Sequence, residues 1–145
     1  MTKKVLLVDD EPYSIEWIAD FVENKGFEVA ICQTFREAYD LISQEEIFAA
    51  SIIDMNIPIL SEDEELIAKK GEVYKQYHGL FLAHELRDFG NDKNSVLIYT
   101  VHDDKNISLI AEKLSVQYFI KGKVKRIKEA LTHQLNYISE HSNKG

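Results

Sequence analysis

The sequence has one cysteine, no long apolar run and fewer basic than acidic residues, and each shortage excludes a class of protein. Cys32 has no partner cysteine in the chain, so no intramolecular disulfide forms, which favours a reducing compartment. The apolar run at the start of the chain is interrupted by charge at Asp9 and is too short for a signal peptide or a membrane span. The net charge is −8, and a surface of that sign repels nucleic acid. We therefore expect a cytoplasmic protein that contacts neither nucleic acid nor a membrane directly.

The length and the hydrophobic pattern predict one α/β domain. A chain of 145 residues, of which 45% are hydrophobic, fits one compact core. Short apolar runs alternate with amphipathic stretches, which is the pattern of repeated βα units around a parallel sheet. The five predicted strands cover residues 4–8, 29–32, 48–53, 96–99 and 116–120. We expect the domain to occupy residues 1–141 and residues 142–145 to form a frayed, polar tail.

Four of the five predicted strands end in a polar or charged residue. Asp9 and Asp10 follow the first strand, and Asp54 follows the third. Thr100 and Lys121 end the fourth and fifth strand regions. Because the carboxyl ends of parallel strands meet at one edge of an open sheet, where ligands bind, we expect these side chains to converge on one small pocket.

Such a pocket needs positive charge. Carboxylates a few ångströms apart repel each other by about 4 kcal/mol per pair at an effective dielectric constant of about 20. A shared proton or a bound cation offsets this repulsion, and Mg²⁺ is the cation that best matches carboxylate and carbonyl oxygens. Together with the Lys121 ammonium, a divalent ion balances three carboxylates, and the pocket then accepts a dianion that shares the metal, such as a phosphoryl group. Thr100 and Lys121 are predicted to bind the phosphoryl oxygens.

The carboxylates of this pocket have different predicted roles. Asp54 is the predicted nucleophile, which attacks phosphorus to form an acyl phosphate. Asp9 and Asp10 are predicted to hold the magnesium ion together with it. Asn56 is predicted to add its backbone carbonyl as a further ligand.

Four runs that carry these residues resemble the response-regulator receiver family. They are Val-Leu-Leu-Val-Asp-Asp-Glu-Pro, Ile-Ile-Asp-Met-Asn-Ile-Pro, Leu-Ile-Tyr-Thr and Tyr-Phe-Ile-Lys, in that order along the chain. The resemblance implies a flavodoxin-like (βα)5 fold, a doubly wound five-stranded parallel sheet with strand order 2-1-3-4-5. It also implies a phosphorylation-switched signalling domain of a two-component system rather than an enzyme. The implied phosphoryl donor is a sensor histidine kinase or a histidine phosphotransfer protein.

The same resemblance implies how such a domain acts on its partners. Thr100 and Tyr118 would move together as the switch when the domain is phosphorylated. The output would be binding to a downstream protein partner or to a second copy of the chain.

The sequence departs most from this family after Pro58. The family reaches the glycine that opens the third helix about four residues after this proline. Here Gly79 follows Pro58 by 79 − 58 = 21 residues. Residues 59–78 are therefore a predicted insertion, partly helical, with a capping box at Ser61 and Glu64. The insertion is either a solvated surface helix or a lid or docking element that moderates access to the phosphorylation site.

Three smaller departures lie at the rim of the predicted site. Val101 stands where the family prefers a very small residue, which predicts a tighter pocket. Gly122 stands where the family usually has proline, so the cis-proline geometry expected there is absent. His102 stands at a position that tends to influence dephosphorylation in receivers, and the alternative is an exposed loop histidine without that role.

Three other functions are compatible with parts of this pattern. A degenerate receiver, used as a constitutive interaction or dimerisation module, is favoured by Val101, Gly122 and the insertion and opposed by the complete set of strand-end residues. A small phosphohydrolase needs a second carboxylate two residues after its nucleophile, and Asn56 stands there. A flavin-binding protein of the same topology binds phosphate at the first βα turn, where Asp-Asp-Glu-Pro repels phosphate unless a metal is bound.

Overall fold

Five parallel strands form the centre of the molecule. The computed structural model describes residues 3–45 and 47–142. The strands are β1 Lys4–Val8, β2 Glu28–Cys32, β3 Ala50–Ile53, β4 Val96–Thr100 and β5 Gln117–Ile120. Every neighbouring pair is parallel, and the order is β2-β1-β3-β4-β5. This order confirms the doubly wound, flavodoxin-like sheet that was expected from the sequence.

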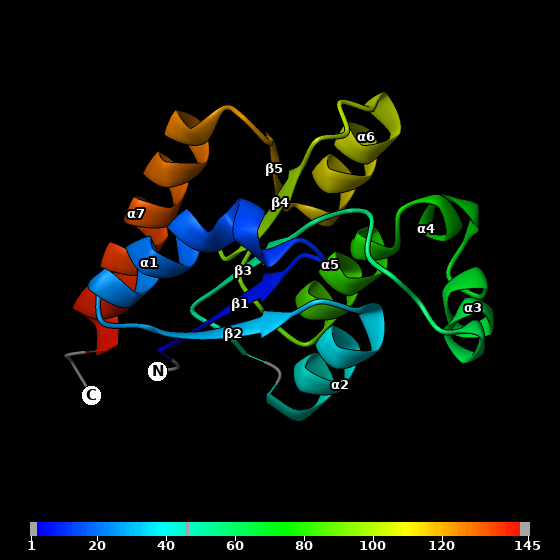
Figure 1. Ribbon diagram of the computed structural model, residues 1–145, viewed down its shortest axis with the longest axis horizontal. Coiled ribbons are helices and arrows are strands. Elements are labelled where there is room, and N and C mark those ends of the chain that lie inside the picture. The colour runs from blue at the N-terminus through cyan, green and yellow to red at the C-terminus, as the bar shows by residue number, and fades with distance from the viewer. Residues whose placement is uncertain (1–2, 46, 143–145) are drawn as a thin grey trace.

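Helices cover both faces of the sheet. In the described residues they are η1 Pro12–Ile15 (a short 3-10 turn), α1 Glu16–Asn24, α2 Phe35–Glu45, α3 Ser61–Ala68, α4 Glu72–Gln76, α5 His78–Asp88, α6 Lys105–Leu114 and α7 Val124–Ser142. In Figure 1, α1 and α7 lie on one face, and α2, α5 and α6 lie on the other. In the part of the chain that is described, no helix is long and apolar enough to cross a membrane.

Side chains of β1 alternate between the two helical layers. Val5 and Leu7 belong to the buried cluster that contains α1 and α7 side chains. Leu6 and Val8 belong to the cluster that contains α2, α5 and α6 side chains. Because both faces of the strand are buried, its sequence is a continuous apolar run rather than an alternating one.

The C-terminal helix is longer than the sequence pattern predicted. α7 includes Ser142, the first residue of the predicted frayed tail 142–145. Local contacts support this last turn: His141 Nδ1 donates to the Tyr137 carbonyl at 2.8 Å, and the two rings stack with their centroids 3.9 Å apart. Residues 143–145 lie outside the described residues.

Between β3 and α5 the chain leaves the sheet and forms the two short helices α3 and α4 within the insertion, residues 59–78. The Gly79 amide donates to the Met55 carbonyl at 3.1 Å, and His78 Nδ1 donates to the Ile57 carbonyl at 3.0 Å. These bonds hold the two ends of the excursion together. The entropic cost of closing a loop rises only slowly with its length, so the added residues cost little. In Figure 1, α3 and α4 lie beside α5, on the side away from α1 and α7.

The start of α3 differs from the predicted capping box at Ser61 and Glu64. Ser61 is already the first helical residue, and the Leu60 amide donates to the Asp63 carboxylate at 3.1 Å. Asp63 is fully buried and forms an ion pair with Arg36 of α2. The predicted capping pair is therefore wrong. The acidic residue that caps α3 is Asp63, which its ion pair with Arg36 holds in place.

Candidate functional site

The ends of β1 and β3 bring two carboxylates together. Val8 pairs with Ile53 in the parallel register. The residues that follow, Asp9 and Asp54, therefore leave the sheet side by side, and the Asp54 amide donates to the Val8 carbonyl at 2.9 Å. Asp9 is 2% exposed and Asp54 is 9% exposed. Two carboxylates this deeply buried need a compensating positive charge.

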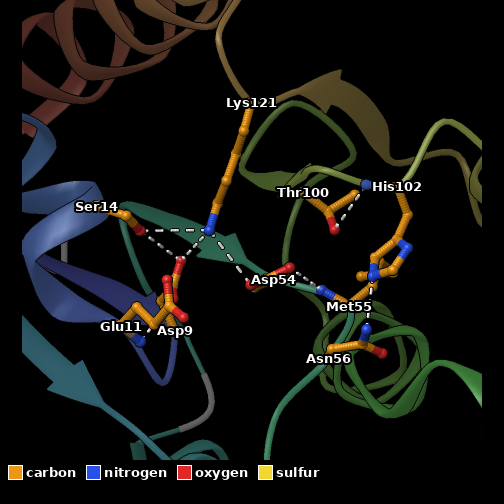
Figure 2. Close-up of polar contacts among 9 residues, drawn as sticks. All are labelled: Asp9, Glu11, Ser14, Asp54, Met55, Asn56, Thr100, His102 and Lys121. Carbon is orange, nitrogen blue, oxygen red and sulfur yellow. Dashed lines mark hydrogen bonds and ion pairs between the residues drawn. The ribbon is translucent and has the colours of Figure 1, made fainter.

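Lys121 supplies this charge from the end of β5. Its backbone amide donates to the Thr100 carbonyl at 2.8 Å, which fixes the point from which its side chain extends. Its ammonium donates to Asp9 Oδ2 at 2.7 Å and to Asp54 Oδ2 at 3.3 Å (Figure 2). Burial lowers the pKa of Lys121, but the hydrogen bond to Asp9 and the charge of Asp54 outweigh burial and raise that pKa above its ordinary value. The lysine is therefore a permanent cation of the site.

Asp9, Asp10 and Asp54 form a cluster that fits a hard divalent cation. One carboxylate oxygen from each residue lies within 4.8 Å of the other two. The Lys121 ammonium offsets one of their three negative charges, so two remain. Three carboxylate oxygens with this residual charge match the ligands that magnesium prefers. Asp10 is exposed, so an ion held here stays accessible to solvent and to a further ligand.

Thr100, His102 and Asn56 lie on the other side of Asp54 (Figure 2). The Thr100 side chain is fully buried, and its hydroxyl accepts from the His102 amide at 3.4 Å. The Asn56 side-chain amide donates to His102 Nε2 at 2.5 Å. Within the described residues, the side chains of Thr100 and Asn56 form no hydrogen bond with Asp54, so they flank the carboxylate without binding it.

The other residues predicted at the rim have different surroundings. Tyr118 is partly buried, and its hydroxyl donates to the His102 carbonyl and accepts from the Asp104 amide at 3.1 Å. The Val101 side chain is 67% exposed, so it is not packed into the core beside the site, and the tighter pocket stays a prediction. Gly122 has a φ of +98°, a conformation that residues with a Cβ rarely adopt.

Ser14 belongs to the site although the strand-end pattern did not reveal it. Its hydroxyl donates to Asp9 Oδ2 at 3.4 Å and accepts from the Lys121 ammonium at 3.3 Å. The sequence signal for it is weak: a serine in the first helical turn after the first strand. Ser14 links that turn to the carboxylate and the lysine of the site.

Several solved structures share this fold. The beryllofluoride-activated receiver domain of Klebsiella pneumoniae RstA is 16% identical, and the match covers 91% of this chain and 97% of that chain with a TM-score of 0.65. A CheY-like response-regulator receiver domain from Methanospirillum hungatei is 20% identical, with 94% and 99% of the two chains covered and a TM-score of 0.64. The beryllofluoride-activated NtrC4 receiver domain, solved as a dimer, is 21% identical, with 94% and 98% covered and a TM-score of 0.66.

Neither the scan against protein families nor the search of curated proteins finds a match to the sequence. The structural likeness nevertheless covers nearly the whole chain, and the strand order agrees with it. The protein therefore has the fold of a response-regulator receiver domain.

Proposed function

We propose that the protein accepts a phosphoryl group on Asp54, with Mg²⁺, and changes its binding to a protein partner in response. The observation that carries this proposal is the charge arrangement at the sheet edge, where Asp54 Oδ2 lies 3.3 Å from the Lys121 ammonium and within one cluster with Asp9 and Asp10. This arrangement accommodates a dianion only together with a cation, a condition that magnesium-dependent phosphoryl transfer meets. The donor we propose is a sensor histidine kinase or a histidine phosphotransfer protein.

The Asp54 carboxylate is held in a defined orientation for this reaction. Its Oδ1 accepts from the Met55 amide at 2.7 Å, and its Oδ2 faces Lys121. A carboxylate oxygen attacks phosphorus, the bond from phosphorus to the donor's histidine nitrogen breaks, and an acyl phosphate forms. Magnesium, when bound, supplies positive charge to the phosphoryl oxygens, and Asp9 and Asp10 would hold it together with Asp54. Lys121 then pairs with a phosphoryl oxygen, because the acyl phosphate has taken up the carboxylate charge that it faced.

The backbone carbonyl of Asn56 completes the proposed set of magnesium ligands. Carbonyl oxygen is a ligand that magnesium accepts alongside carboxylates. The side chain of Asn56 is engaged with His102, so its contribution to the ion would come from the main chain.

The proposed switch consists of Thr100 and Tyr118, which hold one loop from two sides. Thr100 accepts from the His102 amide, and Tyr118 donates to the His102 carbonyl. A phosphoryl group on Asp54 gives the Thr100 hydroxyl a charged acceptor, and its movement toward that acceptor would change the loop that Tyr118 holds. A shift of the population from 1:99 to 99:1 requires about 5.5 kcal/mol of differential stabilisation. A second copy of this chain is one partner to test, because the NtrC4 receiver was solved as an activated dimer.

Incubation with acetyl phosphate and Mg²⁺, followed by intact-mass measurement, tests the proposal. We expect the wild-type protein to gain one phosphoryl group and Asp54→Asn to gain none. Asp103→Asn is the matched control, because Asp103 is an exposed carboxylate outside the cluster, and we expect it to be labelled like the wild type. Removal of Mg²⁺ with a chelator should abolish labelling. Equal labelling of wild type and Asp54→Asn would contradict the proposal, and an unlabelled wild type would favour a constitutive interaction or dimerisation module.

A further inference from the structure

Tyr77, the residue between α4 and α5, joins the insertion to the loop that follows β4. Its side chain is 5% exposed, and its hydroxyl donates to the Asp104 carboxylate. Its ring lies against the His102 ring, with the ring centroids 5.5 Å apart. The Asp104 carboxylate also accepts from the Asn106 amide at 2.8 Å and so caps α6. Tyr77 thus contacts both the residue that caps α6 and a residue at the rim of the site.

The contact between Tyr77 and Asp104 shifts the pKa values of the two groups in opposite directions. The hydrogen bond raises the pKa of Tyr77. The same bond, and then the Asn106 amide, lowers the pKa of Asp104. At neutral pH the phenol therefore keeps its proton and the carboxylate keeps its charge, which are the forms that this hydrogen bond requires.

Besides Thr100, two tyrosines hold the loop after β4, and the histidine of this loop lies next to Asn56. Tyr118 of β5 binds the His102 carbonyl, and Tyr77 of the insertion packs against the His102 ring. The ring places Nε2 2.5 Å from the Asn56 side-chain amide. In Figure 2 the pair of Asn56 and His102 lies beside Asp54, on the side away from the lysine.

We propose that Tyr77 is a positioning residue that keeps His102 on Asn56 and thereby slows hydrolysis of a phosphoryl group on Asp54. This inference rests on the proposed function. In the hydrolysis a water oxygen attacks phosphorus, the bond from phosphorus to the Asp54 carboxylate oxygen breaks, and the carboxylate leaves with the electron pair. The products are the Asp54 carboxylate and inorganic phosphate, and a proton of the water passes to solvent. The hydrogen-bonded pair at the rim restricts the approach of water, and without the Tyr77 hydroxyl the loop loses its hydrogen bond to the insertion.

The lifetime of the phosphorylated protein tests this role. The protein is labelled with acetyl phosphate and Mg²⁺, the donor is removed, and the loss of the phosphoryl group is followed by intact mass. We expect hydrolysis to be about fivefold faster in Tyr77→Phe, since this variant loses a hydrogen bond to a charged group but keeps the ring. Tyr74→Phe is the matched control: Tyr74 is an insertion tyrosine of similar burial (8% exposed), and among the described residues it forms no hydrogen bond to the loop. Its hydrolysis rate should stay within about twofold of the wild type.

A double-mutant cycle separates positioning from a merely structural effect. If Tyr77 acts through His102, the double variant Tyr77→Phe/His102→Ala hydrolyses at the same rate as His102→Ala alone. Asp104→Asn weakens the same contact from the other partner, and we expect about twofold faster hydrolysis from it, which keeps the test available if Tyr77→Phe does not fold. Equal rates in Tyr77→Phe and Tyr74→Phe, or effects of Tyr77 and His102 that multiply, would overturn the inference alone. A wild type that takes no label on Asp54 would instead overturn the proposed function.

Discussion

The Lys121 side of Asp54 and its His102 side are built from different kinds of structure. Lys121 and the carboxylates that it contacts follow strand ends, are mostly buried and carry charge. His102 and Asn56 come from loops and form a hydrogen bond with each other, and the His102 ring lies against Tyr77 of the insertion. We infer that the strand ends supply the chemistry of phosphorylation, and that the insertion sets how long its product lasts. Substitutions in the insertion should therefore change stability or lifetime without abolishing labelling.

The largest effect is expected at Gly79, where the insertion returns to Asp54. A Cβ at Gly79 would overlap the Asp54 carbonyl oxygen and lie 2.8 Å from Met55 Cε. Because the carbonyl is backbone and cannot turn aside, α5 must shift, and we expect Gly79→Ala to lower the free energy of unfolding by about 3 kcal/mol, as measured with urea.

Gly122→Ala is the control for this substitution. Gly122 has a φ of +98°, but a Cβ added there has no neighbour within 4 Å. We expect a loss of about 1 kcal/mol from backbone strain alone. Equal losses of unfolding free energy in Gly79→Ala and Gly122→Ala would show that the close packing of α5 against Asp54 is not required for stability.

An intermediate effect is expected at Asp63, which anchors α3. Asp63→Ala removes a fully buried carboxylate that accepts from the Leu60 amide and pairs with Arg36, so we expect a loss of about 2 kcal/mol in the free energy of unfolding. Asp40→Ala removes the exposed partner of the same arginine and should change stability little. Labelling of Asp54 should be retained in both variants. If Asp63→Ala lost labelling as completely as Asp54→Asn, this would contradict the inference that the insertion is not needed for phosphorylation itself.

The smallest effect is expected in the pH dependence of the Tyr77–Asp104 contact. The pKa of Asp104 is depressed below 3.8, so its contribution to stability is complete above 3.8 and is lost as the pH falls through the lower folded value. The pKa of Tyr77 is raised above 10.0, so its contribution is complete below 10.0 and is lost as the pH rises through the higher folded value. His102 and Tyr118 are the other titratable groups that act on this pair.

Urea unfolding of wild type and Tyr77→Phe across this pH range measures the contribution of the contact. The difference between the two proteins should be constant near neutral pH and shrink at both extremes. If the difference in the free energy of unfolding did not change with pH, the stabilisation by the Tyr77 hydroxyl would not depend on the charge of Asp104.

The sheet and the strand-end residues were predictable because parallel topology brings the strand ends to one edge whatever their separation in sequence. Even so, β3 begins at Ala50 rather than at the predicted Phe48. The Phe48 amide donates to Asn91 Oδ1 at 3.0 Å, and this buried side-chain contact replaces a strand contact. An apolar run indicates burial, but it does not distinguish a paired strand residue from a buried residue just before the strand.

The contacts of the insertion were not predictable because they join residues with no periodic relation to one another. Asp63 pairs with Arg36, and Tyr77 with Asp104, each 27 residues away. The first turn of α3 has several acidic residues, and the sequence does not show which of them caps the helix. In the structure it is Asp63, the buried carboxylate that also pairs with Arg36. His102 was singled out through the family resemblance, and its hydrogen bond to Asn56 depends on a loop shape that the sequence pattern does not specify.

Chemical trapping of the acyl phosphate tests the central claim most directly. Borohydride reduces phosphoaspartate to homoserine, so the protein is incubated with acetyl phosphate and Mg²⁺, reduced, digested and mapped by peptide mass. We predict that homoserine replaces aspartate at position 54, and at no other aspartate of the chain. Homoserine at another aspartate, with position 54 unchanged, would contradict the account.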